Sequence, residues 1–460
     1  MNIRCTHCPD IRSTDDDTDS NPRSTTREAS PTMTSDDRPN DGSRSARSRR
    51  EVLGATSGAV LAGLTGCLGG GTAVSGGGGG GDSGTTTARW AGTQNPETSC
   101  WDYEDDSSEG ADQCGLVYPV FELKRRLEER SADLELTLVD SKELCSEQSC
   151  MTKMDSRVIE LGSSSVANSA KVWPENEIWS IPYLFPTHSR ASIGYAFTHP
   201  TVWEEYWVPF GRKYGAIPIG FDPPGYRAHF VGVGSDPEEP MTSPADFEGL
   251  KIRTTQSEVI SVAFDELGMN PTTVSFADTL QGMKSGVVDG MEIIPQYAVS
   301  AGITDVTAQA TLTQWAPGLD PIWCSVDFLK GLSDGERETF ASVTAELAEE
   351  SVRRSDDVYE SFQGLSPDAP VEGSNYQTEG PDGEPVRVNW LEEDQLAEWR
   401  EPVDPATNPD LYRDAIDRVH GEFTDGFFDR VYDVARESGV PDRSADFSLD
   451  AWWDDYLERI

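Results

Sequence analysis

Residues 276–292 read FADTLQGMKSGVVDGME, and the order of elements in this stretch decides the fold class. A helix is predicted from Ala277 to Ser285, and Gly286 is the signal that ends it. A strand is predicted directly afterwards, at Val287–Val288. Just upstream, another helix is predicted from about Gln256 to Leu267. Strands that alternate with helices of this length predict an α/β protein with parallel strand pairing.

The same alternation extends in both directions along the chain. Strands are predicted at 88–91 and 134–138, and an amphipathic helix at 116–130 has Leu116, Val120, Leu123 and Leu127 on one stripe. A capping box, Ser333 with Glu336, opens a long helix that should reach about Phe362. Residues 364–386 read as a surface insertion, and further helices are expected after Asn408 and from Leu449 to Ile460.

Signatures of catalysis are missing from the sequence. The five histidines have no metal-ligand spacing, and the chain has no HExxH, GxSxG, GxGxxG or P-loop motif. We therefore expect a protein that is not an enzyme and that uses neither a metal nor a cofactor.

Four stretches, taken in order, resemble the solute receptors of tripartite ATP-independent periplasmic (TRAP) transporters, the DctP-type family. Residues 179–185 (WSIPYLF) resemble a strand of the family, and residues 225–227 (GYR) resemble its Gly-x-Arg segment. Residues 247–253 (FEGLKIR) are similar to its Leu-Lys-Ile-Arg signature. Residues 267–292 resemble its most specific block, which ends in Asp-Gly-x-Glu.

The resemblance implies a periplasmic-binding-protein-like α/β fold of two lobes, with an interlobe cleft and a long connecting helix. On this basis we expect the following divisions: a disordered leader with an export signal at 1–67, a Gly-rich tether at 68–87, the first part of lobe I at 88–222, the core of lobe II at 223–305, returning strands and the long helix at 306–400, and a helical C-terminal extension at 401–460.

The resemblance also implies which residues bind the ligand. Arg253 matches the family arginine that pairs with the ligand carboxylate, and a guanidinium suits this role because it offers two parallel N–H donors. Arg227 matches a second frequent arginine, and Phe276 matches an aromatic residue that often lines the pocket. Ser164, in a Ser-rich turn, lies where the first lobe often supplies polar contacts. The alternatives are a surface ion pair for Arg253, a core position for Phe276 and a plain turn for Ser164.

One position departs from the family pattern. An asparagine that binds the carboxylate usually follows the Asp-Gly-x-Glu run, whereas Ile293 and Ile294 stand here. Ile293 therefore predicts a rebuilt pocket that suits a bulkier or more apolar acid than a small dicarboxylate.

The N-terminal part of the sequence predicts export and anchoring. Arg49-Arg50 precedes an apolar run that ends at Gly66, and fifteen residues are too few to span about 30 Å of hydrocarbon. This order resembles a twin-arginine (Tat) signal, and residues 64–67 (LTGC) resemble a lipobox whose Cys67 carries the lipid. We expect an exported protein, lipid-anchored at the outer face of the cytoplasmic membrane. A start at Met33 stays open, and so does a weak zinc motif at Cys5 and Cys8.

Five cysteines remain in the exported part. Four of them cluster, which in an oxidising compartment favours two disulfides among Cys100, Cys114, Cys145 and Cys150 over a metal site. Three pairings are possible. Cys324 lies in an apolar run and is expected to be a buried free thiol.

The charge of the chain limits its partners. It carries 81 acidic against 37 basic residues, a formal net charge of −44. Such a surface repels phosphate backbones, so nucleic acid is excluded as an electrostatic partner. Molar salt shortens the Debye length to about 3 Å and relieves the self-repulsion, so we expect a halophile-like protein whose folding depends on salt.

The expected function is that of a receptor that captures a small carboxylate ligand and delivers it to the small and large membrane subunits of a TRAP permease. Three alternatives remain: a sensor or a receptor of the same fold for another permease, a secreted enzyme that uses carboxylate pairs, and a structural surface lipoprotein.

Overall fold

The computed structural model describes residues 85–92, 118–139, 147–185, 190–254, 257–357, 364–365, 374–378, 380–437, 439–441, 443–449 and 451–460. Residues 79–460 form one compact unit. The predicted leader, the anchor Cys67, most of the tether and three of the clustered cysteines (Cys100, Cys114 and Cys145) lie outside the described residues.

The first sheet belongs to lobe I and has the strand order β2-β1-β3-β10-β4. Its strands are β1 (Thr86–Ala91), β2 (Leu134–Val139), β3 (Leu161–Ser163), β4 (Ala216–Tyr226) and β10 (Pro317–Ser325). β1 runs parallel to β2 and β3, whereas β10 runs antiparallel to β3 and β4.

The second sheet belongs to lobe II and has the strand order β11-β9-β5-β8-β6-β7. Its strands are β5 (Ala228–Gly232), β6 (Lys251–Thr254), β7 (Asn270–Thr273), β8 (Gly290–Ile293), β9 (Thr307–Thr311) and β11 (Arg387–Asn389). β6 runs parallel to β7 and β8, and β5 runs antiparallel to β8 and β9.

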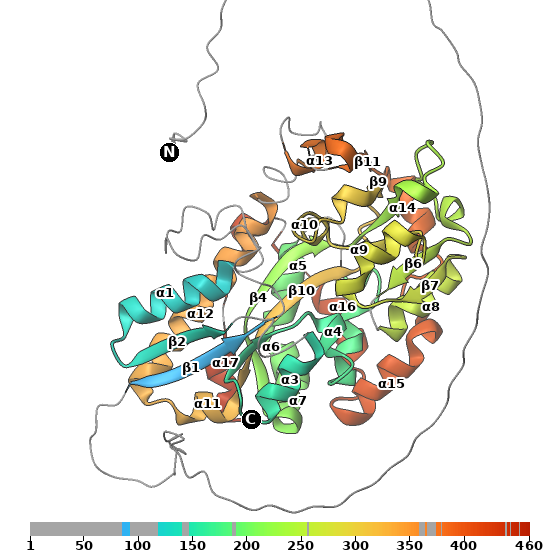
Figure 1. Ribbon diagram of the computed structural model, residues 1–460. Coiled ribbons are helices and arrows are strands. Elements are labelled where there is room, and N and C mark those ends of the chain that lie inside the picture. Colours follow the sequence, from blue (N-terminus) through green and yellow to red (C-terminus); the bar gives the residue numbers. More distant parts are fainter. Residues whose placement is uncertain are drawn as a thin grey trace, which may run out of the picture. The chain divides into compact units, whose positions relative to one another are not determined.

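The α/β class and the two lobes are confirmed. Parallel pairing is confirmed within each lobe, for example between β1 and β2 and between β6 and β7, but β4 and β10 pair antiparallel. The exception has a topological reason, because the chain leaves lobe I through β4 and returns to it through β10. An outgoing and a returning strand that lie side by side are necessarily antiparallel. Figure 1 shows β4 and β10 together between the strands of the two lobes.

The helices cover both sheets. They are α1 (Tyr118–Arg130), α3 (Glu147–Asp155), α4 (Val166–Ser169), α5 (Ala191–Thr198), α6 (Pro200–Val202), α7 (Val208–Tyr214), α8 (Glu258–Glu266), α9 (Phe276–Ser285), α10 (Pro295–Ser300), α11 (Val326–Gly331), α12 (Asp334–Asp357), α13 (Asn375–Thr378), α14 (Glu393–Arg400), α15 (Arg413–Glu422), α16 (Phe427–Val434) and α17 (Trp453–Leu457). Short 3-10 turns include η3 (Pro174–Ser180), η7 (Thr304–Val306) and η10 (Pro409–Tyr412), and η4 (Trp203–Trp207) is a π turn.

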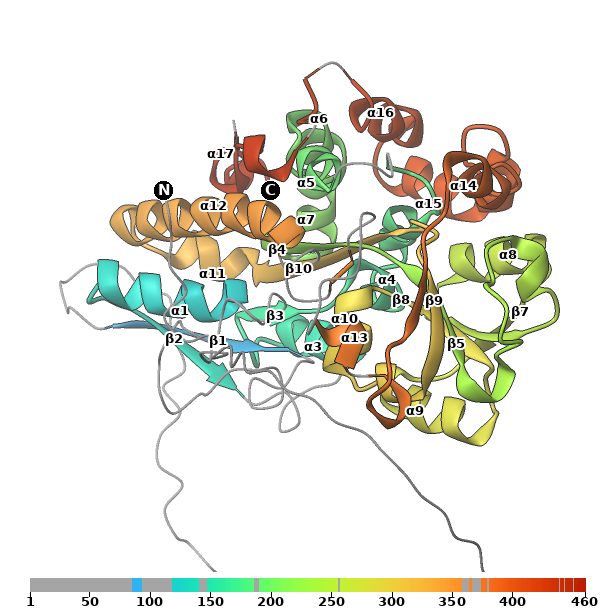
Figure 2. The same ribbon diagram turned by 90° about the horizontal axis from the view of Figure 1, so that it is seen from above.

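The long helix begins as predicted. The Ser333 hydroxyl and backbone N–H both donate to the Glu336 carboxylate, and the Ser333 oxygen accepts from the Glu336 N–H, which completes the capping box. Figure 2 shows α12 running alongside β4 and β10, and α12 also contacts α1. The predicted stripe of α1 is buried at Val120, Leu123 and Leu127.

The larger hydrophobic core is rich in aromatic rings. The Trp179 ring stacks on Trp207 with centroids 5.4 Å apart and meets Phe197 edge-on at 5.5 Å. A smaller core in lobe II contains Phe230, Met291 and Ile293. The two cores hold the two sheets in place.

Three local predictions are wrong. Residues 179–185 form the end of a 3-10 turn and an irregular segment in place of a strand. The strand expected at Val287–Val288 begins at Gly290, because Gly286 adopts φ 72° and the backbone N–H groups of Val287 and Val288 bond back to Gly282. The segment 364–386 is more than a surface insertion, since Leu365, Tyr376 and Val386 are buried in the smaller core.

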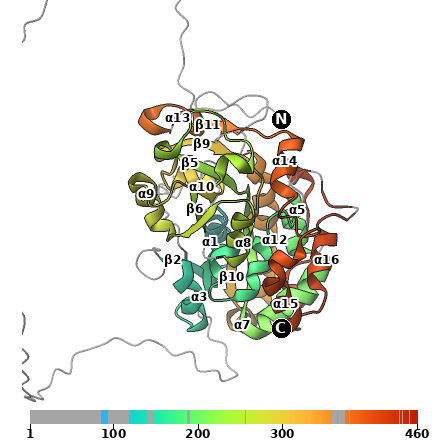
Figure 3. The same ribbon diagram turned by 90° about the vertical axis from the view of Figure 1, so that its right-hand side faces the viewer.

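The C-terminal extension packs against both lobes. η10 contacts α8 of lobe II, and α15 contacts η3 of lobe I. Figure 3 shows α14, α15 and α16 together along one side of this unit. Within the part of the chain that the structure describes, no helix is long and apolar enough to cross a membrane.

Candidate functional site

Strand ends and helix starts meet at one edge of the lobe II sheet. The parallel strands β6 and β8 end there. Arg253 of β6 pairs with Met291 of β8, and Glu292 is the next residue along β8. α8, α9 and α10 start just after the ends of β6, β7 and β8. The carboxyl edge of parallel strands is where ligands bind in α/β folds.

This edge faces the segments that join the lobes. β4 passes into β5 through Arg227, and residues 312–316 lead from β9 into β10. The Arg227 N–H donates to the Ala316 carbonyl oxygen at 2.9 Å, and the Trp315 N–H donates to the Arg227 carbonyl oxygen at 3.1 Å. We call this pair of segments, residues 226–228 and 312–317, the crossing. It places Arg227 between the two sheets.

Arg253 is buried, with 4% of its surface exposed. Its Nε donates to the carbonyl oxygen of Val274, just beyond β7, at 3.0 Å. The centre of its guanidinium lies 5.8 Å from the ring centroid of Phe276. Phe276 itself is 36% exposed, which argues against a core position. The structure thus brings together two of the residues that sequence analysis singled out.

Arg227 has a charge partner within the protein. One terminal nitrogen lies 2.9 Å from Glu292 Oε2, and the two side chains are 7% and 0% exposed. Burial acts to lower the pKa of Arg227, but the Glu292 carboxylate outweighs it, so the pKa is raised. Glu292 lies within the motif of residues 267–292, but the motif predicts no role for it.

Two further carboxyl groups lie on the long strands that adjoin the crossing. Asp320 of β10 is directly opposite Asp222 of β4, and the Tyr297 hydroxyl of α10 donates to Asp320. Burial raises the pKa of Asp320 to about 6, although Tyr297 and Arg227 act to lower it. Burial and then the charge of Asp320 raise the pKa of Asp222 well above its usual range. Asp320 was not among the predicted site residues, and its only signal in the sequence is that of an acidic residue within an apolar strand.

Several polar atoms in this region are buried and lack a hydrogen-bond partner among the described residues. They include Asp222 Oδ2, Glu292 Oε1, Trp315 Nε1 in the crossing and the hydroxyl oxygen of Thr254, which directly follows Arg253. Most buried polar groups in proteins are partnered. Orphaned atoms at one sheet edge and on the adjoining strands indicate hydrogen-bonding capacity that the fold itself does not use.

The start of α8 is already occupied. Glu177 of η3 in lobe I accepts from the Ser257 hydroxyl at 2.8 Å and from the Glu258 N–H at 3.2 Å. Burial raises the pKa of this carboxyl, although Ser257 and the backbone donors act against it. A ligand carboxylate at this edge is therefore expected to use Arg253 and not the N-terminus of α8.

The other predicted ligand-binding residues, Ile293 and Ser164, are buried. Ile293 is 2% exposed, pairs with Ala228 and packs in the smaller core. Ser164 is 2% exposed, and its carbonyl oxygen accepts from Trp323 Nε1 at 3.0 Å. Their contact with a ligand stays a prediction.

The structure describes two of the five cysteines in the exported part. Cys324 is a buried free thiol, as expected, and Cys150 is disulfide-bonded. Which cysteine pairs with Cys150 stays a prediction.

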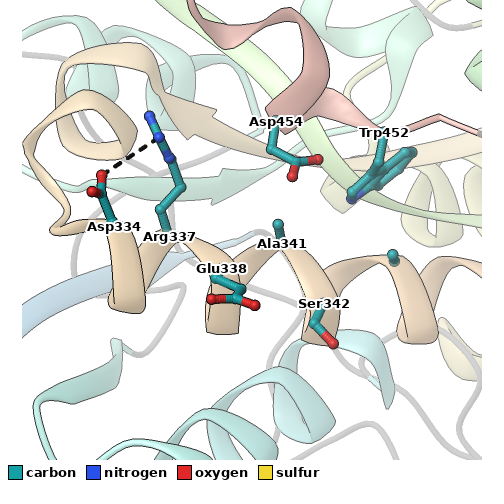
Figure 4. Close-up of a pocket in the computed structure, with 8 residues that line it drawn as sticks. Asp334, Arg337, Glu338, Ala341, Ser342, Trp452 and Asp454 are labelled. Atoms are coloured by element: carbon teal, nitrogen blue, oxygen red, sulfur yellow. Dashed lines mark ion pairs between the residues drawn. The ribbon is translucent and has the colours of Figure 1, made fainter.

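An open hollow of about 450 Å³ lies elsewhere, between α12 and the segment around α17. Figure 4 shows Asp334, Arg337 and Glu338 on α12 with Asp454 facing them. Its one arginine is already paired with Asp334 at 3.7 Å and with Glu458 at 3.1 Å. A hollow with three carboxylates and one paired arginine does not suit an anionic ligand. Among the described residues, no group of three or more His, Cys, Asp or Glu side chains could hold a metal ion.

Comparison with known proteins identifies relatives of this fold. The chain is 24% identical over 196 residues to the ectoine-binding periplasmic protein TeaA of Halomonas elongata, a match that covers 43% of this chain and 55% of the relative. It is 35% identical over 74 residues to the C4-dicarboxylate-binding periplasmic protein DctP of Rhodobacter capsulatus, covering 16% of this chain and 22% of the relative. These matches span about half or less of each relative's length.

A solved structure, the sugar acid binding protein DctPAm from Advenella mimigardefordensis in complex with galactonate, aligns with a TM-score of 0.59 at 17% identity. The alignment covers 77% of this chain and 99% of that protein, which shows the shared fold. A family model described as bacterial extracellular solute-binding protein, family 7, matches residues 119–363, more than half of the 460 residues. The chain therefore belongs to the bacterial extracellular solute-binding proteins of family 7.

Proposed function

We propose that this protein is an extracytoplasmic receptor that captures a small organic acid and delivers it to a TRAP-type secondary transporter. The observation that carries the proposal is the buried Arg253, at the sheet edge that faces the crossing, in a chain of this family. The names of the relatives point the same way, since they bind ectoine, C4-dicarboxylates or a sugar acid. The protein would act by binding and release, without catalysis.

Arg253 would hold the ligand carboxylate with two parallel N–H donors, and the Thr254 hydroxyl would add a third. Arg227 would help from the crossing. Its pairing with Glu292 involves one terminal nitrogen, and a guanidinium carries five N–H donors. Phe276 would cover the site from the start of α9. A ligand held between the lobes would favour their closed arrangement through its contacts with both.

The experiment is calorimetric titration of the full chain in molar KCl with ectoine, succinate and galactonate. Truncating one partner of a buried charge pair costs about 2–5 kcal/mol, so Arg253→Ala should lose roughly 30- to 5,000-fold in affinity for the best ligand. Arg253→Lys should recover only part, because an ammonium lacks the two-pronged fit. The matched control is Arg387→Ala, which removes an arginine from β11 of the same sheet, where Arg387 pairs with Asp236 at 3.5 Å. Binding by Arg253→Ala within about threefold of the parent would refute the site.

Export and anchoring belong to the same proposal. Arg49-Arg50 would direct folded protein to the Tat pathway, and Cys67 would carry the lipid that keeps the receptor beside the two permease subunits. Cys67→Ser should then release exported protein into the medium, measured by fractionation of cells and medium. If this variant stays as firmly cell-bound as the parent, the anchor is somewhere else.

A further inference from the structure

We propose that Glu177 is a positioning residue for solute capture. From lobe I it holds the start of α8 in lobe II, and it thereby fixes the end of β6, with Arg253, in the closed arrangement of the lobes. The inference rests on the proposed function and adds a residue that controls the same site. It follows from hydrogen bonds that pass between the lobes where η3 contacts α8, and we call this contact the seam.

Three consecutive polar residues of η3 are buried, and the first two fasten this turn to lobe I. Glu175 accepts from Lys213 Nζ at 2.9 Å and from the Tyr214 hydroxyl at 2.5 Å, both at the end of α7. Asn176 is fully buried and accepts from the Tyr206 hydroxyl at 2.8 Å. Because these partners all belong to lobe I, η3 has a fixed position on that lobe.

Glu177 is the third of these residues, and its carboxylate reaches across the seam. It is 5% exposed, and both of its oxygens accept hydrogen bonds from lobe II. Oε2 accepts from the Ser257 hydroxyl at 2.8 Å and from the Val259 N–H at 3.4 Å. Oε1 accepts from the Glu258 N–H at 3.2 Å. The first N–H groups of a helix have no partner within the helix, and its N-terminus attracts negative charge, so Glu177 caps α8 from the other lobe.

The start of α8 lies close along the chain to the candidate ligand site. Arg253 and Thr254 end β6, and Ser257, which is 1% exposed, comes four residues after Arg253. α8 also packs on β7, the neighbour of β6 in the sheet, so the helix and this end of the sheet move together. Holding the start of α8 against η3 therefore also sets how far Arg253 lies from lobe I.

The C-terminal extension contacts both sides of the seam. η10 contacts α8, and α15 contacts η3. Arg418 of α15 donates to the Pro174 carbonyl oxygen at 3.1 Å, and a second terminal nitrogen lies 4.0 Å from Glu258 Oε2. The hydrogen bonds of Glu177 are thus shielded from water, and hydrogen bonds to an ionised group are stronger than those between neutral groups. Opening the lobes would break these bonds, so the seam opposes the escape of a bound solute.

The first test measures the distance between the lobes without solute, in molar KCl. Fluorescence energy transfer is recorded between dyes at Glu128→Cys of α1 and Lys284→Cys of α9, two exposed positions on lobe I and lobe II. Glu177→Ala should raise the ratio of open to closed molecules about tenfold or more, since it removes bonds to a charged group. Glu177→Gln should raise the ratio less, because the amide oxygen can still accept a hydrogen bond.

The matched control is Glu175→Gln, on the same turn. It neutralises a carboxylate that is 2% exposed, whereas Glu177 is 5% exposed, but the Tyr214 and Lys213 partners of Glu175 lie in lobe I. Asn176 still fastens η3 in this variant, so the distance between the lobes should equal that of the parent. A variant that only weakens lobe I is thereby distinguished from one that releases the seam.

The second test follows the rates of binding of ectoine, succinate and galactonate by stopped flow. For the probe that binds best, Glu177→Ala should speed dissociation about tenfold or more and should change the association rate less than about threefold. Ser257→Ala tests the same contact from lobe II, should the larger substitution fail to fold. It should open the lobes in part, and in the Glu177→Ala background it should open them no further, because both substitutions remove one contact.

The outcomes separate this inference from the function on which it rests. The inference is wrong if Glu177→Ala leaves the distance between the lobes as in the parent, if Glu175→Gln opens them equally, or if the effects of Glu177→Ala and Ser257→Ala add. An unchanged dissociation rate in Glu177→Ala also overturns it, while the receptor stands. Energy transfer without solute does not depend on the choice of probe. Failure of all three probes to bind therefore counts against the proposed function, and the energy transfer still decides the role of Glu177.

Discussion

Two regions of this protein bury carboxylates, and they treat them in opposite ways. On α1, Glu122 is 2% exposed and accepts from Arg125 Nε at 3.0 Å, from a terminal nitrogen of Arg125 at 2.6 Å and from Arg126 Nε at 2.9 Å. Both of its oxygens are therefore partnered. Next to the crossing, Glu292 accepts one hydrogen bond, from Arg227, and its second oxygen has no partner among the described residues.

The difference also appears in the pKa values. Burial acts to raise the pKa of Glu122, but Arg125 and Arg126 outweigh it, so the pKa is lowered. For Asp320, burial outweighs Tyr297 and Arg227, and the pKa is raised to about 6. A buried acid that is fully partnered stabilises a fold, whereas buried acids with spare acceptors cost stability and are found where a ligand supplies the missing donor.

The comparison is tested most strongly by neutralising one acid in each region. Glu292→Gln leaves the buried Arg227 without its paired counter-charge, and breaking such a pair costs about 3–5 kcal/mol of unfolding free energy. Glu122→Gln should cost less, about 1–2 kcal/mol. The reason is that Arg125 and Arg126 keep other partners, Glu129 at 2.7 Å and Glu350 at 2.6 Å. Urea unfolding in molar KCl measures both values.

Arg353→Gln on α12 serves as the reference for a surface pair, since Arg353 bonds Glu349 at 2.5 Å with 44% of its side chain exposed. Its cost should not exceed about 1 kcal/mol. Equal losses for Glu292→Gln and Glu122→Gln would show that the two regions do not differ, and a larger loss for Glu122→Gln would reverse the comparison.

The sequence predicted those parts of the molecule that depend on neighbours along the chain. The capping box of α12, the stripe of α1 and the stop at Gly286 all act within a few residues, and each was located correctly. The start of β8 was misplaced because both valines after Gly286 take part in the turn that ends α9. A pattern of apolar residues cannot distinguish such a turn from the first residues of a strand.

The candidate site was predictable only where a motif carried it. Arg253 and Phe276 come from signatures, and the guanidinium of Arg253 lies 5.8 Å from the ring centroid of Phe276. Asp320 meets Asp222 and Tyr297 from distant parts of the chain, through an antiparallel register that includes an irregularity between Gly318 and Asp320. A sequence analysis that expects parallel strands cannot place these groups together, because the contact exists only when β10 returns beside β4.

The comparison is sharpened by a smaller effect, the dependence of stability on pH. The groups known to act on Asp320 are Tyr297 from α10, Arg227 from the crossing and Asp222 from β4. Burial and then the charge of Asp320 raise the pKa of Asp222 as well, and Asp320 is the acid of this pair whose pKa lies at about 6. With a pKa of about 6, it is about nine-tenths ionised at pH 7 and about one-tenth ionised at pH 5.

The sign of the effect on stability follows from the raised pKa. The folded state takes up a proton on Asp320 more readily than the unfolded chain does, so Asp320 should add stability as the pH falls through 6. Between pH 7 and pH 5 the parent should therefore gain about 1.3 kcal/mol of unfolding free energy relative to Asp320→Asn, which has no proton to take up at this position. Urea unfolding of both proteins at the two pH values measures this difference. An undiminished pH dependence in the variant would assign the titration to another group.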